Sequence, residues 1–81
     1  MNNYIFAICQ GNKNKLHKLV APSYDEAVNK AKEEIDTYLN LDDETYSILE
    51  DNDSWINIRA ELAKKGIYVT YIRDIEEFFN L

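Results

Sequence analysis

The 81-residue chain has little of several residue types on which common functional sites depend. A single cysteine, Cys9, cannot form an internal disulfide, and with only one histidine the chain has no Cys/His cluster for zinc. The two glycines stand apart, so there is no glycine-rich phosphate loop. The longest apolar run, Tyr4 to Cys9, is far shorter than the roughly 20 residues of a transmembrane helix. We therefore expect no cofactor, no metal, no membrane partner and a cytoplasmic location.

The bulk composition predicts one α+β domain spanning residues 1–81. A hydrophobic fraction of 46% excludes a disordered chain, and a chain of this length buries about 60% of its unfolded surface. The residue usage is rich in Asn, Ile, Lys and Tyr and poor in Gly, Pro and Arg. This usage is typical of an AT-rich coding genome, such as that of a low-GC bacterium or its phage.

Two strands open the chain, Tyr4–Cys9 and Lys15–Ala21, and a Gly11-Asn12 loop favours a type II′ hairpin between them. Because side chains alternate along a strand, this register divides the hairpin into two faces. One face carries Ile5, Ala7, Cys9, Leu16 and Val20, and the other carries Tyr4, Phe6, Ile8, His17 and Leu19. Both faces of the first strand are apolar, which predicts a central position in the sheet.

A helix over residues 24–39 has the clearest start in the chain. Ser23 and Glu26 form a capping box, and Asp25 suits the positive end of the helix dipole. Apolar residues recur at spacings of three and four, which predicts a buried stripe. The stripe consists of Ala27, Val28, Ala31, Ile35, Tyr38 and Leu39.

The second half of the chain is expected to complete a layered fold. Thr45–Leu49 favours a short strand by its β-forming residues, with a helical turn as the alternative. The further predictions are a helix over Trp55–Lys65 capped by Asp53 or Ser54, Gly66 at its C′ position, a strand over Ile67–Ile72 and a short helix over Asp74–Phe79. The order β-β-α-(β)-α-β-(α) predicts an antiparallel-containing sheet of three or four strands, with two main helices on one face.

Catalytic and metal-binding patterns fail on spacing. A two-residue hairpin loop places Cys9 and His17 on opposite faces, which forbids a nucleophile–base pair, whereas a three-residue loop would bring them together. Asp51-Asn52-Asp53 begins like a calcium loop, but Ile56 and Leu62 stand where that loop needs Gly and Glu. We therefore predict a non-enzymatic protein with no catalytic residue.

Two segments, Glu61–Thr70 and Arg73–Phe78, resemble the helix-turn-helix of arginine-repressor-type DNA-binding domains. That resemblance implies a recognition helix after Gly66. Only Tyr71 and Ile72 separate the two segments, which is too few residues for such a helix to align. A DNA reader also needs a basic patch, whereas this chain has a net charge of −6. A helix, a glycine and a strand account for these residues better.

The acidic residues are concentrated between Tyr24 and Asp53. This stretch holds eleven of the fifteen acids of the chain and only two lysines, Lys30 and Lys32. Such a surface either serves solubility or matches a basic partner. The predicted partner-binding residues are Glu33, Asp36, Asp42, Asp43, Glu44, Glu50, Asp51 and Asp53, with Tyr46 and Trp55 among the aromatic anchors. The two clusters Asp42–Glu44 and Glu50–Asp53 flank a short segment that could bring them onto one rim.

In general character the chain is similar to phage-encoded inhibitors of bacterial defence, the anti-CRISPR and antirestriction proteins that mimic DNA. The likeness lies in size, charge and composition, not in a motif. It implies a non-enzymatic inhibitor, monomer or homodimer, of a basic nucleic-acid-binding protein in a bacterial host cell, without direct nucleic-acid binding. The alternatives are an immunity protein or antitoxin against a basic nuclease, and an oligomerising accessory protein.

Overall fold

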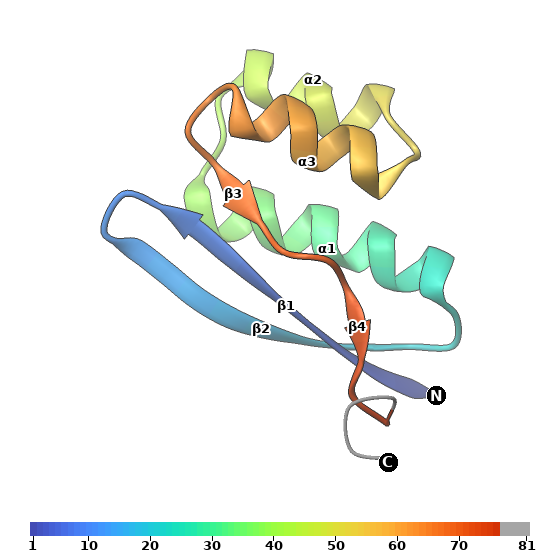
Figure 1. The fold of residues 1–81 in the computed structure, drawn as a ribbon. Coiled ribbons are helices and arrows are strands. Elements are labelled where there is room, and N and C mark those ends of the chain that lie inside the picture. The colour runs from blue at the N-terminus through green and yellow to red at the C-terminus, as the bar shows by residue number, and fades with distance from the viewer. Residues whose placement is uncertain (77–81) are drawn as a thin grey trace.

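A computed structural model describes residues 1–76 and confirms the α+β class (Figure 1). A four-stranded antiparallel sheet carries three helices on one side and none on the other among the described residues. The elements are β1 (Asn2–Gln10), β2 (Lys13–Ala21), α1 (Tyr24–Leu39), α2 (Asp43–Asp51), α3 (Trp55–Ala63), β3 (Tyr68–Val69) and β4 (Arg73–Asp74).

The hairpin forms in the predicted register. Gln10 pairs with Lys13 across the two-residue loop, and Gly11 has a φ of 58°, the left-handed region that a type II′ turn requires at its first position. Phe6 pairs with His17, while Cys9 lies one residue out of phase and faces the other side. The separation of Cys9 from His17 is therefore confirmed. β1 is also central as predicted, because β2 pairs with one side of it and both β3 and β4 with the other.

Helix α1 begins and ends where the sequence predicts. The Ser23 hydroxyl accepts a hydrogen bond from the Glu26 amide at 3.3 Å, and Asn40 ends the helix in the left-handed conformation with a φ of 53°. Ala27, Ala31 and Ile35 are fully buried against the sheet. Two small residues among these three let α1 lie close to β2.

The prediction of a strand at Thr45–Leu49 is wrong, because these residues lie within helix α2. The Asp42 side chain caps this helix by accepting a hydrogen bond from the Thr45 amide at 2.8 Å. Leu41, Thr45 and Leu49 recur every four residues, and the last two are buried. This helical spacing and the cap outweigh the weak β preference of Tyr46 and Ile48.

Helix α3 ends two residues earlier than predicted, and Gly66 terminates it. The Ile67 amide donates to the Leu62 carbonyl and the Gly66 amide to the Ala63 carbonyl, each at 3.0 Å, which is the hydrogen-bond pattern of a Schellman motif. Gly66 has a φ of 78°, as its C′ position requires. Ser54 occupies the N-cap position but its side chain makes no capping hydrogen bond.

The predicted strand Ile67–Ile72 is interrupted. β3 pairs Val69 with Ile8, and β4 pairs Arg73 with Ile5. Val69 and Arg73 are four residues apart in sequence, whereas their partners in β1 are only three residues apart. This extra residue is a β-bulge at Thr70–Ile72. The Thr70 hydroxyl accepts from the Ala7 amide at 2.8 Å, which leaves the Thr70 carbonyl free to accept from the Trp55 indole at 2.9 Å.

One hydrophobic cluster joins the sheet to all three helices. Phe6, Ile8, Ile35, Leu49, Ile58 and Leu62 are its largest fully buried side chains. β3 and β4 follow Gly66 where a recognition helix would have to stand, so the helix-turn-helix resemblance is not realised. The Asp74 side chain accepts from the Glu76 amide at 2.9 Å, but the remainder of the predicted helix through Phe79 lies outside the described residues.

Candidate functional site

The acids of the helical layer are mostly not neutralised. Only two of the eleven acids between Tyr24 and Asp53 have a basic side chain within ion-pair distance among residues 1–76: Glu44 pairs with Lys65, and Glu34 lies beside His17. The two lysines of this stretch bond to carbonyl oxygens instead, Lys30 to that of Val20 and Lys32 to that of Asn52. The helical layer therefore keeps a strongly negative surface.

Part of this charge gathers in a groove between α1 and α2, here called the acidic groove. Its acidic lining residues are Glu26, Glu33, Asp36 and Glu50, with Lys32 and Tyr46 beside them. Glu33 and Asp36 are three residues apart, which places their Cβ atoms about 5–6 Å apart on the helix surface. The groove thus brings together four of the predicted partner-binding residues: Glu33, Asp36, Tyr46 and Glu50. It adds Glu26 and Lys32, which were not in that predicted set.

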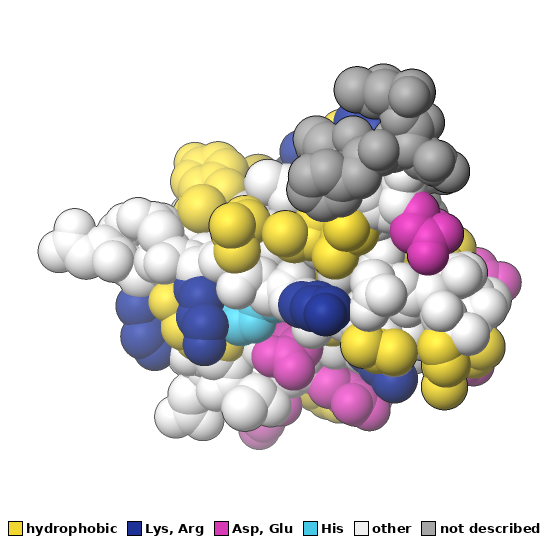
Figure 2. All heavy atoms as spheres, turned by 90° about the horizontal axis from the view of Figure 1, so that it is seen from below, with side chains coloured by type: hydrophobic (Ala, Val, Ile, Leu, Met, Phe, Trp, Pro, Cys, Tyr) yellow, Lys and Arg dark blue, Asp and Glu magenta, His cyan; other side chains and the backbone are white. Residues whose placement is uncertain are grey.

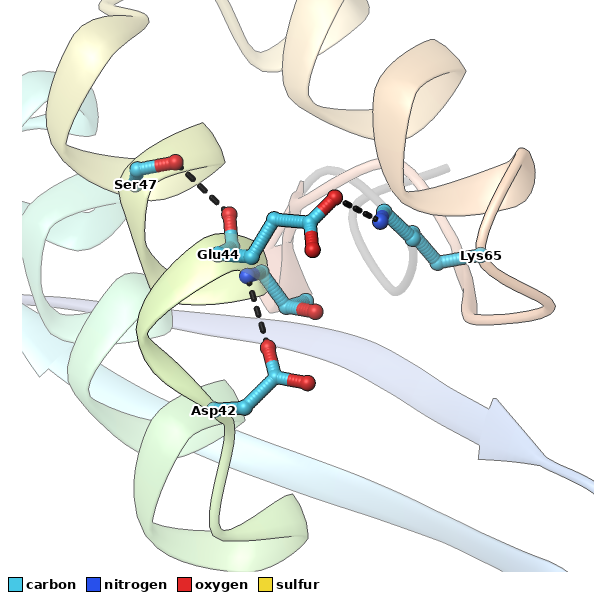
Figure 3. Close-up of polar contacts among 5 residues, drawn as sticks. Asp42, Glu44, Ser47 and Lys65 are labelled. Carbon is cyan, nitrogen blue, oxygen red and sulfur yellow. Dashed lines mark hydrogen bonds and ion pairs between the residues drawn. The ribbon is translucent and has the colours of Figure 1, made fainter.

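The acids at the N-terminus of α2 have structural roles (Figure 3). Asp42 caps the helix, Asp43 and Glu44 occupy its first turn, and Glu44 accepts from Lys65 at 2.7 Å. Negative charge in a first turn is favourable because it meets the positive end of the helix dipole. The proximity of Glu44 also raises the pKa of Lys65. Folding alone therefore explains why Asp42, Asp43 and Glu44 are acidic.

The stabilisation by Asp42 is expected to depend on pH. Hydrogen bonding from the side chain and the amide of Thr45, aided by the charge of Lys65, holds the pKa of Asp42 below its usual 3.8. Because the folded-state pKa is the lower one, this stabilisation is present above the usual value and is lost as the pH falls through the folded-state pKa. Asp42→Ala should lower the melting temperature at neutral pH, and the difference from the wild type should shrink below about pH 4.

Circular dichroism melts between about pH 7 and about pH 2 would measure this difference. Asp42→Asn is the control, because asparagine remains a good N-cap without a charge that titrates. An Asp42→Ala deficit that stays the same down to the lowest pH would contradict an ionised cap.

The clusters Asp42–Glu44 and Glu50–Asp53 are separated along α2. They lie at opposite ends of α2, and a nine-residue helix is about 13 Å long. Glu50 and Asp51 stand in the last turn, where negative charge meets the negative end of the dipole and no basic residue offsets it. The charge that folding leaves unexplained is therefore at Glu50, Asp51 and Asp53, together with the α1 side of the acidic groove.

Trp55 cannot serve as an exposed anchor. It is 4% exposed, packs edge-on against Phe6 and donates its indole hydrogen to the backbone of β3–β4. This burial corrects the prediction that Trp55 contacts a partner. Tyr46 is 38% exposed at the acidic groove and remains available as an aromatic contact.

His17 has a structural environment. It is buried between the rings of Phe6 and Tyr38, and its Nδ1 lies 3.2 Å from the Glu34 carboxylate. Its Nε2 has no hydrogen-bond partner among the described residues. Cys9 lies on the other face of the sheet, so the pair offers no nucleophile and base.

Sequence reasoning did not identify the other face of the sheet, here called the open face, as a candidate site. The helices of residues 1–76 cover only one side of the sheet. On the other side Leu16, Val20, Tyr68 and Tyr71 are exposed. Figure 2 shows hydrophobic side chains gathered on this face with Lys and Arg side chains beside them. The alternation of side chains along β1 was the available signal for an apolar second face. It places Ile5 and Ala7 on the face of the sheet away from Phe6 and Ile8.

Residues 1–76 contain no cluster of three or more His, Cys, Asp and Glu side chains arranged to hold a metal ion. Within the same residues, none of the helices combines the length and apolar content needed to cross a bilayer. No family model, no curated protein and no solved structure matches the chain.

Proposed function

We propose that this chain is a non-enzymatic binding protein whose acidic groove docks on a basic, nucleic-acid-binding bacterial protein, such as a CRISPR or restriction effector. The observation that carries the proposal is the gathering of Glu26, Glu33, Asp36 and Glu50 along one groove without a matching set of basic side chains. Like charges held together raise the energy of the folded state, and a basic partner relieves that repulsion.

The arrangement suits a partner that normally holds nucleic acid. Carboxylates recur along α1 at Glu26, Glu33 and Asp36, so negative charge follows the helix axis for about 15 Å. The phosphates of a nucleic-acid backbone likewise present negative charge repeated along a line to the basic cleft that binds them. Tyr46 supplies an aromatic surface beside these charges, and tyrosine is favoured at the centres of protein interfaces.

Neutralising the groove is expected to weaken such binding. The variant Glu33→Gln, Asp36→Asn and Glu50→Gln should inhibit the partner at least about tenfold less well at roughly 50 mM salt, and the difference should fade by roughly 500 mM. The measurement is DNA cleavage by a panel of purified CRISPR, restriction and toxin nucleases, with the wild type and the variant titrated in. A purified toxin inhibited alone would favour the antitoxin alternative.

A matched control removes the same amount of charge elsewhere. Asp25→Asn, Glu61→Gln and Glu76→Gln change the net charge equally and lie outside the acidic groove. If this control weakens inhibition as much as the groove variant, net charge and not the groove carries the effect. Inhibition unchanged by salt and by the groove variant would overturn the proposal.

A further inference from the structure

The open face has a trough at its centre. Ala7 of β1 forms the floor, because its side chain is the smallest in this part of the face, and Leu16 of β2 and Tyr71 stand on either side. Leu16 is 66% exposed and Tyr71 is 47% exposed, while Ile5 and Ile75 complete an apolar lining. The trough therefore offers room for one large apolar side chain.

The wall formed by Tyr71 is held in place. The Arg59 guanidinium lies 3.9 Å from the centre of the Tyr71 ring, and Arg59 Nε donates to the Val69 carbonyl at 2.8 Å. The β-bulge at Thr70–Ile72 places Tyr71 beside the trough, outside the regular strand pairing. Ordering this ring before binding reduces the entropy that a ligand must overcome.

Two cations flank the same trough. Lys18 and Arg73 are the register partners of Ile5 on its two sides, so they stand about 10 Å apart across β1 and about 7 Å along the strand from Ala7. Neither belongs to an ion pair within residues 1–76. β1 and β2 contain no acid at all, so these strands supply no neutralising charge.

We propose that the open face is a second interface, which takes an extended segment of a partner protein carrying a large apolar side chain next to carboxylates. The apolar side chain fills the trough over Ala7, and the carboxylates meet Arg73 and Lys18. Charge complementarity selects an acidic segment, and the like charge of two copies disfavours pairing of this face with itself. This interface is opposite in charge and position to the acidic groove, so it does not depend on the function proposed above.

The test uses a blocked peptide with the sequence of residues 76–81, which combines two glutamates and two phenylalanines. Fluorescence anisotropy of the labelled peptide should show saturable binding to the full chain. Ala7→Val fills the trough, and Arg73→Gln removes a cation; each should weaken binding about tenfold. Leu16→Ser, at an exposed wall, gives the same test without touching the core. Lys13→Gln removes the same charge on the helical side and should leave binding unchanged.

Several results would overturn the proposal. One is the absence of binding to the full chain, and another is binding that none of the trough variants alters. Binding only to a chain that ends at Glu76 would assign the trough to this chain's own last residues. A concentration-dependent dimer in sedimentation, abolished by Leu16→Ser, would assign it to a second copy.

Discussion

Replacing Trp55 by alanine is expected to remove about 3–5 kcal/mol of folding free energy. The side chain is 4% exposed, its ring centre lies 5.8 Å from that of Phe6, and its indole donates to the Thr70 carbonyl at 2.9 Å. Trp55 thus joins the start of α3 to both β1 and the bulge. For a domain whose total stability is about 5–15 kcal/mol, this loss is a large fraction of the whole.

Urea unfolding followed by far-ultraviolet circular dichroism measures the loss without using the tryptophan signal. Trp55→Phe is the matched control, because it keeps an aromatic ring against Phe6 and removes the hydrogen bond. Its expected cost is about 1–2 kcal/mol. A Trp55→Ala loss no greater than that of Trp55→Phe would show that the ring adds nothing to the core.

Replacing Leu49 by alanine is expected to cost about 2–5 kcal/mol. Leu49 is 1% exposed and is the main apolar side chain that α2 contributes to the core, while Thr45 one turn earlier is the other buried residue of that helix. The cavity left behind would loosen α2 from its neighbours, and with it one wall of the acidic groove. The same urea titration measures the effect.

Ser47→Ala tests the helical conformation of this segment. In a strand Ser47 would share the face of Leu49, whereas in α2 it points elsewhere and its hydroxyl donates to the Glu44 carbonyl at 2.6 Å. The expected change is therefore within about 0.5 kcal/mol. Equal losses for Ser47→Ala and Leu49→Ala would contradict the helix.

The segment around Leu49 shows why part of the fold escapes sequence reasoning. Thr45, Tyr46 and Ile48 favour strands when they are weighed one by one, yet strand preference largely reflects packing against neighbouring strands. The signals for a helix were Asp42 as a cap and the four-residue spacing of Leu41, Thr45 and Leu49. Both signals include residues before Thr45, outside the segment Thr45–Leu49. The interrupted strand after Gly66 has a similar cause, because Thr70 turns its carbonyl toward Trp55, fifteen residues away in sequence.

The candidate site, like the fold, could be predicted from the sequence only in part. Excess charge between Tyr24 and Asp53 is visible in the sequence, but its distribution into capping acids and groove acids is not. Asp42 accepts a hydrogen bond from Thr45, and Glu44 pairs with Lys65. In contrast, Glu33 and Glu50 line the same groove only because α1 and α2 lie side by side. Contacts between helices depend on how their buried faces pack, and local spacing does not report them.

The sequence by itself determined the hairpin register, the capped helix α1, the opposite placement of Cys9 and His17 and the stop at Gly66. Each follows from a period of two or 3.6 residues or from a single residue that a turn requires. The tertiary structure decided which acids share a groove, that Trp55 is buried and that no helix of residues 1–76 covers the sheet face with Ala7 at its centre. These features arise where segments distant in sequence pack against one another, because only that packing determines which polar and apolar side chains stay at the surface.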